Sequence, residues 1–262
     1  MPWEIAVALG ALQGVTEFLP ISSSGHLILV ERLLGAKPPG LAWEVALHVG
    51  TLGAVLAVYG REVLALLGAA LDGPRRWRSA PGDRLVALVV ASLPAAAAAL
   101  VLEDFVGGPR FTLRWLGLCW VISGLLVAAF TRRPGRGQAL TLRRAVGMGL
   151  AQGLAVLPGI SRSGATIAVG MGMGLEPGEC ARFSFLLSVP AVVGAMVFTG
   201  ADLAAQGAPP VGTLVLGAAV SGLTGYAALR LLLRLLTGGR LWWWGAYTIV
   251  LGTAVWALGA GG

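Results

Sequence analysis

Long apolar segments separated by short polar connections recur along the whole chain. Each is close to the ~20 residues that an α-helix needs to cross a bilayer, and the alternation over about ten residues that is typical of a transmembrane β-barrel strand is not seen. The pattern therefore predicts an all-α polytopic membrane protein with about six transmembrane helices. The expected spans are 43–67, 85–102, 113–130, 181–198, 211–229 and 241–258.

Two stretches, at about 1–36 and 145–176, break this pattern. Each has an apolar half, a segment rich in Gly, Pro and Ser, and a second apolar half, and neither half is long enough to span. The polar segments read QGVTEFLPISSSGHL and QGLAVLPGISRSGAT, and they align at one offset of 139 residues, which pairs Gln13 with Gln152. We therefore expect two re-entrant helical hairpins that are copies of one another.

The distribution of charge indicates how the chain threads the membrane. Only 12% of the residues are charged, the net charge is +7, and most of the arginines lie in 72–84, 131–144 and 230–240. Positive loops stay cytoplasmic, so the first hairpin is expected to enter from outside and the second from inside. No basic or aromatic stripe stands apart from these loops, which disfavours a nucleic-acid partner. The tryptophans of LWWWGAY, at 241–247, are expected at the membrane interface.

Opposite entry makes the two hairpins an inverted-topology repeat, an arrangement that brings discontinuous helices together near mid-membrane. We expect a single membrane domain over 1–262, with repeat one at about 1–130 and repeat two at about 140–262. Non-helical backbone at that depth survives only when it is buried in protein or lines a wet cavity. The two polar segments are therefore expected to meet and form one site.

The side chains of that expected site suit a phosphorylated ligand that arrives from the lipid. Gly25 and Gly164 each precede an apolar half-helix whose first turn exposes unpaired N–H groups, and such termini bind phosphate together with serine hydroxyls and an arginine. An arginine at mid-membrane is costly and usually marks function. The polar residues expected at the site are Gln13, Glu17, Ser22, Ser23, Ser24, His26, Gln152, Ser161, Arg162, Ser163 and Thr166.

Hydrolysis of a phosphoanhydride needs a nucleophile, a proton carrier and stabilisation of charge. Ser23 could attack with Glu17 or His26 as the base, or water could attack directly, while Arg162 holds the transferring phosphoryl group. The Glu17 carboxylate could also hold a divalent cation that bridges phosphate oxygens. The alternatives are structural roles: helix capping or packing for the serines, and a buried ion pair for Glu17 with Arg162.

The motifs QGVTEFLPISSSGHL and LPGISRSGATIAVGMGMG, with FSFLLSVPAVVGA at 183–195, resemble those of the undecaprenyl-diphosphate phosphatases, the bacitracin-resistance membrane family, over essentially the whole chain. The resemblance implies a bacterial plasma-membrane enzyme that removes the terminal phosphate of undecaprenyl diphosphate. It implies recycling of the monophosphate carrier for envelope polymers, and bacitracin resistance. It places the family's catalytic glutamate on Glu17, its candidate serine nucleophile on Ser23, its histidine on His26 and its essential arginine on Arg162.

The resemblance further implies six spans, two re-entrant hairpins, a pocket open to the outer face, and Mg²⁺ or Ca²⁺ as a cofactor. This chain has Gln13 where the family often has a second glutamate. We therefore expect one protein carboxylate, that of Glu17, with the diphosphate supplying most of the metal's ligands. A homodimer is left open. The residues expected to bind the diphosphate are Ser22, Ser24, Gly25, Ser161, Ser163, Gly164 and Thr166, with Gln13 and Gln152 supporting them.

Two other functions fit parts of the pattern. Inverted repeats that meet at mid-membrane are a transporter architecture, so a polyprenyl-phosphate transporter or flippase with the same site is the runner-up, and a passive binder of the lipid carrier is the third. Only the phosphatase needs a nucleophile, either Ser23 or water. Glu44 and His48, one helical turn apart in the first span, either support the site or pair with one another.

Overall fold

The computed structural model describes residues 2–33, 40–77, 80–108, 110–132, 135–206 and 211–259. Within these residues the chain forms ten α-helices and one 3₁₀ turn, without a β-strand, which confirms the all-α class. The elements are α1 (Trp3–Phe18), α2 (Ser23–Leu33), α3 (Leu41–Leu71), η1 (Pro74–Arg76), α4 (Gly82–Val106), α5 (Leu113–Phe130), α6 (Leu142–Leu154), α7 (Arg162–Gly172), α8 (Pro177–Gln206), α9 (Val211–Thr237) and α10 (Trp242–Leu258).

Five helices in the described part of the chain are long and apolar enough to cross a membrane, so this is a multi-pass membrane protein. The sixth expected span corresponds to α10. Its 17 residues extend about 26 Å at 1.5 Å per residue, slightly less than the ~30 Å hydrocarbon core. The five apolar stretches are Ala42–Leu71 in α3, Gly82–Leu102 in α4, Leu113–Phe130 in α5, Pro177–Val197 in α8 and Val211–Leu236 in α9.

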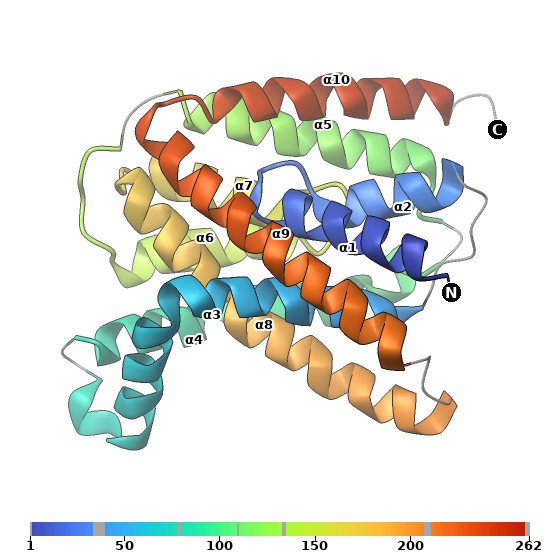
Figure 1. Cartoon of the computed structure of the whole chain (residues 1–262). Coiled ribbons are helices and arrows are strands. Elements are labelled where there is room, and N and C mark those ends of the chain that lie inside the picture. Colours follow the sequence, from blue (N-terminus) through green and yellow to red (C-terminus); the bar gives the residue numbers. More distant parts are fainter. Residues whose placement is uncertain are drawn as a thin grey trace.

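Helices α5 and α10 form a tightly packed pair, seen side by side in Figure 1. Gly117 and Gly124 of α5 face Gly252 and Gly245 of α10. A Cβ added to Gly117 would lie 2.5 Å from the Gly252 carbonyl oxygen, so only glycine permits the two backbones to approach so closely. Small residues at helix interfaces allow this kind of packing in membranes. The two helices therefore pack backbone against backbone at these glycines.

Two pairs of shorter helices, α1–α2 and α6–α7, occupy the segments that break the hydrophobic pattern. Their lengths of 16, 11, 13 and 11 residues fall short of the ~20 needed to span. Non-helical breaks at residues 19–22 and 155–161 separate the two helices of each pair. Helix α1 packs against α3 and α9, α6 packs against α4, and α7 packs against α5 and α8. Residues 34–36, at the end of the first expected hairpin, lie outside the described residues.

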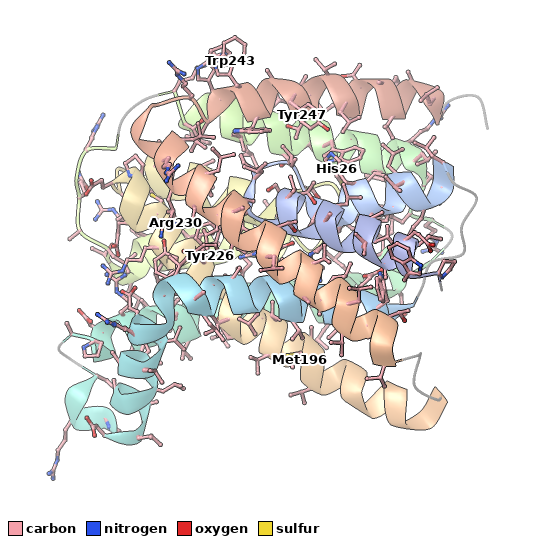
Figure 2. All side chains as sticks on the ribbon, in the orientation of Figure 1. His26, Met196, Tyr226, Arg230, Trp243 and Tyr247 are labelled. Carbon is pink, nitrogen blue, oxygen red and sulfur yellow. The ribbon has the colours of Figure 1, made fainter. Side chains whose placement is uncertain are left out.

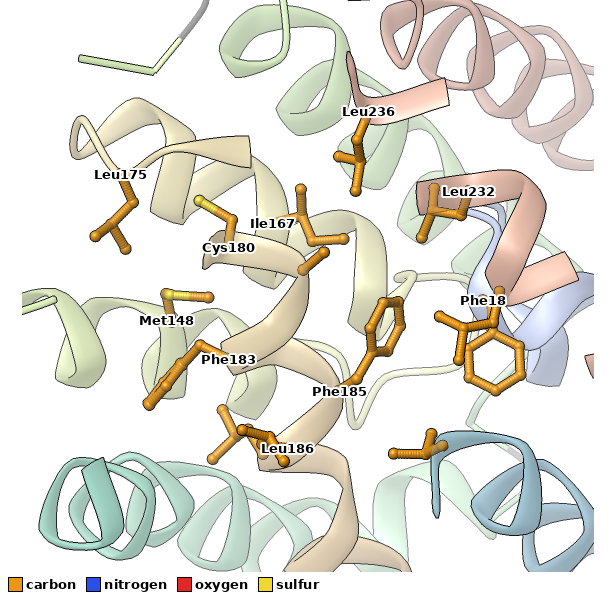
Figure 3. Packing of buried hydrophobic residues seen from close by; sticks show 14 of the residues in the cluster. Phe18, Met148, Ile167, Leu175, Cys180, Phe183, Phe185, Leu186, Leu232 and Leu236 are labelled. Atoms are coloured by element: carbon orange, nitrogen blue, oxygen red, sulfur yellow. The ribbon is translucent and has the colours of Figure 1, made fainter. Parts of the chain in front are cut away.

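The largest buried apolar cluster lies beside the first break. Phe18, the last residue of α1, packs edge-on against Phe185 of α8 with ring centroids 5.5 Å apart. Figure 3 shows both rings among buried apolar side chains that include Ile167 and Leu232. Burial of such a side chain contributes roughly 1.5–3 kcal/mol. The end of α1 is thereby fixed to α8 at the residue that follows Glu17.

Candidate active site

Glu17 is the meeting point of the two helix pairs. Its Oε2 accepts a hydrogen bond from Ser23 Oγ at 2.5 Å and one from Gln13 Nε2 at 3.0 Å. Its Oε1 accepts from Arg162 Nη2 at 2.6 Å, across 145 residues of sequence. The Glu17 residue is only 9% exposed. The buried Glu17 carboxylate of α1 therefore accepts from a hydroxyl of α2 and from a guanidinium of α7.

A proline and a strained serine shape the first break. Pro20 cannot continue α1, and it favours the extended conformation that Leu19 adopts. Ser22 then takes a backbone φ of 68°, a left-handed conformation that costs a non-glycine residue about 1–2 kcal/mol. Helix α2 begins at the next residue. The break therefore turns Ser23 back onto Glu17, six residues earlier in the chain.

The second break turns at a glycine and ends in a helix cap. Gly159 has a φ of 97°, which glycine adopts without strain. Ser161 Oγ accepts a hydrogen bond from the Gly164 N–H at 3.1 Å and caps α7, whose first residue is Arg162. The Gly159 N–H donates to Ser22 Oγ at 3.1 Å. The two breaks therefore touch one another directly, as well as through the Glu17 carboxylate.

Hydroxyl groups hold the first turn of α7 in place. Ser163 Oγ donates to the Glu17 carbonyl oxygen at 3.4 Å. Thr166 Oγ1 donates to the Arg162 carbonyl oxygen at 2.7 Å and lies 2.6 Å from Ser184 Oγ. Ser184 of α8, which the sequence did not single out, also presents its carbonyl oxygen 3.5 Å from Arg162 Nη1. The hydroxyl groups therefore hold the backbone from which Arg162 extends, and the Ser184 carbonyl oxygen contacts the guanidinium itself.

His48 of α3 lies between Glu17 and Glu44, so both interpretations of the Glu44–His48 pair find a contact in the structure. Its Nε2 lies 3.7 Å from Glu17 Oε2, and its Nδ1 lies 2.8 Å from the backbone carbonyl oxygen of Glu44. The imidazole is therefore next to the Glu17 carboxylate while it also contacts its own helix. The His48 side chain is 31% exposed, against 7% for that of Glu17.

The other expected residues lie around this centre in different ways. The ring nitrogens of His26 contact the first break and α10: Nδ1 lies 2.8 Å from the Ser22 carbonyl oxygen and Nε2 lies 2.9 Å from the Tyr247 hydroxyl. Ser24 Oγ lies 3.4 Å from Ser22 Oγ. Gln152 is buried, and neither of its amide atoms has a hydrogen-bond partner in the part of the chain that the structure describes. Tyr247 was not predicted, because its motif was interpreted as an interfacial belt.

Comparison with known proteins connects this geometry to one family. The model of the family described as bacitracin resistance protein BacA matches residues 6–254. The chain belongs to the BacA family. A relative from Desulfosudis oleivorans is 42% identical over 261 residues, which cover 94% of each chain. One from Geobacter sulfurreducens is 42% identical over 260 residues, which cover 95% of this chain and 96% of the relative. Both relatives are named undecaprenyl-diphosphatase, so the family resemblance noted from the motifs is confirmed.

A divalent cation would find few protein ligands at this BacA-family site. Mg²⁺ and Ca²⁺ take about six or more oxygen ligands. The Glu17 carboxylate is already engaged by Ser23, Gln13 and Arg162, and the described residues contain no cluster of three His, Cys, Asp or Glu side chains. Gln13 Oε1 is buried without a partner among those residues, which adds one carbonyl oxygen. These residues do not fit a cation held by a cage of protein carboxylates.

Proposed function

We propose that this BacA-family protein hydrolyses undecaprenyl diphosphate to undecaprenyl phosphate and inorganic phosphate. The reaction recycles the lipid carrier for cell-wall synthesis and confers bacitracin resistance. Family membership and the names of the relatives support this function. The observation that carries it is the shared carboxylate: Glu17 holds a hydroxyl at 2.5 Å and a guanidinium at 2.6 Å. These are the base, nucleophile and charge-stabilising group that a phosphoryl transfer needs.

In this reaction Ser23 and Glu17 act as nucleophile and base. Glu17 Oε2 takes the proton of Ser23 Oγ, along their existing hydrogen bond. The Ser23 Oγ forms a bond to the terminal phosphorus as the bond from that phosphorus to the bridging oxygen breaks, and undecaprenyl phosphate leaves. Water then hydrolyses the phosphoserine. In the alternative mechanism, water attacks the phosphorus directly and Ser23 is only a hydrogen-bond partner. Trapping a phosphoserine by rapid quench would distinguish the two mechanisms.

In this proposal Arg162 stabilises the transferring phosphoryl group, and the first turns of α2 and α7 hold the rest of the diphosphate. The Arg162 guanidinium donates to the same Glu17 carboxylate as Ser23. Because arginine has five N–H donors, it keeps others for phosphate oxygens. Both ring nitrogens of His26 are engaged, one by the Ser22 carbonyl oxygen and one by the Tyr247 hydroxyl, so Glu17 is the base in this proposal. The remaining diphosphate-binding groups are the first turns of α2 and α7, with Ser22, Ser24, Gly25, Ser161, Ser163, Gly164 and Thr166.

The cation, Mg²⁺ or Ca²⁺, belongs in this proposal to the substrate complex. The Glu17 carboxylate and the Gln13 carbonyl oxygen are the protein groups that would hold it, so the diphosphate oxygens would supply most of its ligands. When bound, such an ion would neutralise part of the diphosphate charge. Titration of activity with Mg²⁺ at increasing substrate concentration tests this: the cation requirement should follow the substrate concentration and not the enzyme concentration.

We place the protein in the bacterial plasma membrane, with its two helix pairs entering from opposite faces as an inverted repeat. The Arg-rich connections support this orientation, which opens the site to the outer face. A homodimer stays a prediction. Labelling of single cysteines in intact cells tests the orientation, since a cysteine at Glu4, an exposed residue of α1, should react from outside. Reaction from the cytoplasmic side alone would reverse the proposed topology.

Arg162→Ala tests the function and the site together. Purified protein in detergent should release phosphate from undecaprenyl diphosphate, and the variant should lose about 10²–10³-fold or more in kcat, as removal of a transition-state donor does. Arg230→Ala is the matched control, because Arg230 is an exposed arginine of α9 whose guanidinium contacts only Tyr226 among the described hydrogen bonds. Full activity of Arg162→Ala would reject the site. A transporter or flippase is disfavoured, because it has no need of the serine–glutamate contact.

A further inference from the structure

Tyr247 of α10 contacts the first break from a distant part of the sequence. Its hydroxyl lies 2.9 Å from His26 Nε2, across 221 residues. The two rings stack with centroids 6.0 Å apart and an interplanar angle of 7°, and Figure 2 shows both side chains on facing elements. Tyr247 is 43% exposed, whereas His26 is only 9% exposed. The buried imidazole is therefore held by a side chain at the edge of the protein.

The hydrogen bonds of His26 determine which of its nitrogens carries the proton. Nδ1 lies 2.8 Å from the Ser22 carbonyl oxygen, and a carbonyl oxygen only accepts hydrogen bonds, so Nδ1 carries a proton. In the neutral ring Nε2 is then the acceptor, and the Tyr247 hydroxyl donates to it. A partner on one ring nitrogen sets the tautomer and the ring orientation. Tyr247 therefore orients the N–H that His26 directs at Ser22.

Ser22 is the residue of the first break that most needs such support. It is the only non-glycine residue at positive φ among those that the structure describes, and strained conformations persist only when their surroundings hold them. The Ser22 carbonyl oxygen accepts from both the backbone N–H and the Nδ1 of His26. The neighbouring Ile21 carbonyl oxygen accepts from Trp120 Nε1 of α5 at 2.9 Å. Trp120 of α5 therefore holds the Ile21 carbonyl directly, and Tyr247 of α10 holds the Ser22 carbonyl indirectly, through His26.

We propose that Tyr247 is a positioning residue for the phosphatase reaction. Through His26 it holds the Ser22 turn, and this turn keeps Ser23 Oγ against Glu17 and Ser22 Oγ against the second break. The inference rests on the proposed function, because it explains how the nucleophile of that function is held. It also gives the His26 ring a task that does not require transfer of a proton to the substrate.

Tyr247→Phe tests the proposal, because it removes the hydroxyl and keeps the ring that stacks on His26. The chain has two histidines, so protein in detergent micelles labelled with ¹⁵N-histidine gives two sets of ring signals, which His48→Gln assigns. We expect His26 in the wild type to show a protonated Nδ1 and a hydrogen-bonded Nε2, and the variant to shift the Nε2 signal. With undecaprenyl diphosphate as the substrate, kcat should fall about five- to tenfold, and KM should stay within about twofold.

Tyr226→Phe is the matched control. Tyr226 lies on α9, where its hydroxyl accepts from Arg230 at 3.4 Å, and both residues are labelled in Figure 2. This control should leave the His26 signals and kcat unchanged. The proposal is overturned if Tyr247→Phe keeps kcat at the wild-type value, whether or not the Nε2 signal moves, or if the variant raises KM alone. Failure of the wild-type protein to release phosphate would instead reject the proposed function, while the ¹⁵N signals would still report the His26–Tyr247 contact.

Discussion

The two short helix pairs have the same cap but different chemistry. In α1–α2, Ser22 Oγ accepts from the N–H three residues later at 3.4 Å, and in α6–α7, Ser161 Oγ does the same at 3.1 Å. These serines are partners at the offset of 139 residues, and the residue that follows each is the first of its second helix. That residue is Ser23 in one pair and Arg162 in the other. The repeat therefore places a hydroxyl and a guanidinium at matching positions on either side of Glu17.

The two pairs differ in where the turn is strained. Ser161 has an ordinary φ of −71°, and positive φ in its break falls on Gly159, where it is free of strain. In the first break positive φ falls on Ser22 itself. The position that matches His26 is Ala165, a buried residue of α7 without a polar side chain. The comparison teaches that the imidazole occurs only in the pair whose serine is strained, which is the pair that supplies the acid and the hydroxyl.

The largest expected effect comes from the carboxylate that only the first pair possesses. Glu17→Gln keeps the size of the side chain but removes the base for Ser23 and the charge that orients Arg162. We expect kcat to fall about 10³-fold, within the range for loss of a general base. Glu4→Gln, an exposed change in the same helix, is the control. Phosphate release measured at saturating substrate checks this, and a loss below tenfold would contradict the assigned role.

The next largest expected effect is a loss of stability when the turn at Gly159, in the second break, is changed. Gly159→Ala would introduce a Cβ 2.8 Å from the Leu116 carbonyl oxygen and from Cys119 Cβ, at a φ of 97°. We expect about 2–3 kcal/mol of destabilisation, measured by unfolding in detergent. Gly53→Ala, in an open position of α3, should be neutral or slightly stabilising. Equal stability of the two variants would show that the second break is not closely packed.

The smallest expected effects come from removing the two capping hydroxyls, those of Ser161 and Ser22. Ser161→Ala removes a cap from a relaxed turn, so we expect about 1 kcal/mol of lost stability with kcat reduced only a few-fold. Ser22→Ala removes a similar cap and also the acceptor for the Gly159 N–H, so its kcat should fall further than that of Ser161→Ala. Paired measurements of unfolding and kcat check this order. If both serines affected kcat equally, the strained turn would have no special role.

Much of the site could be predicted from the sequence because it lies in the repeat. The matching polar breaks predicted that Glu17, Ser23 and Arg162 belong together, and the structure places Ser23 and Arg162 on the same carboxylate. Helix boundaries also followed from hydropathy, with α5 at 113–130 as expected. The hydropathy pattern ends the corresponding span at 229, before the first arginine, while α9 continues to Thr237. Arginine side chains can reach the interface from within a continuing helix.

The supporting side chains could not be predicted, because they come from helices that the chain packs around the repeat. His48, Ser184 and Tyr247 lie in apolar segments whose pattern predicts only spans. Their contacts with Glu17, Thr166 and His26 depend on how the helices pack in three dimensions. The positive φ of Ser22 could not be predicted from the sequence either, because SSSG is compatible with an ordinary helix cap. Local pattern therefore predicted that Ser23 and Arg162 meet at Glu17, and tertiary packing determined which side chains support them.

The central claim is that Glu17 joins the two helix pairs into one catalytic unit. A double-mutant cycle on kcat with Glu17→Gln and Arg162→Lys tests it most directly, because residues that act as a unit have non-additive effects. We predict that the kcat of the double variant is about equal to that of the less active single variant. Two losses that multiply would mean that the carboxylate and the guanidinium act independently, which would contradict this account.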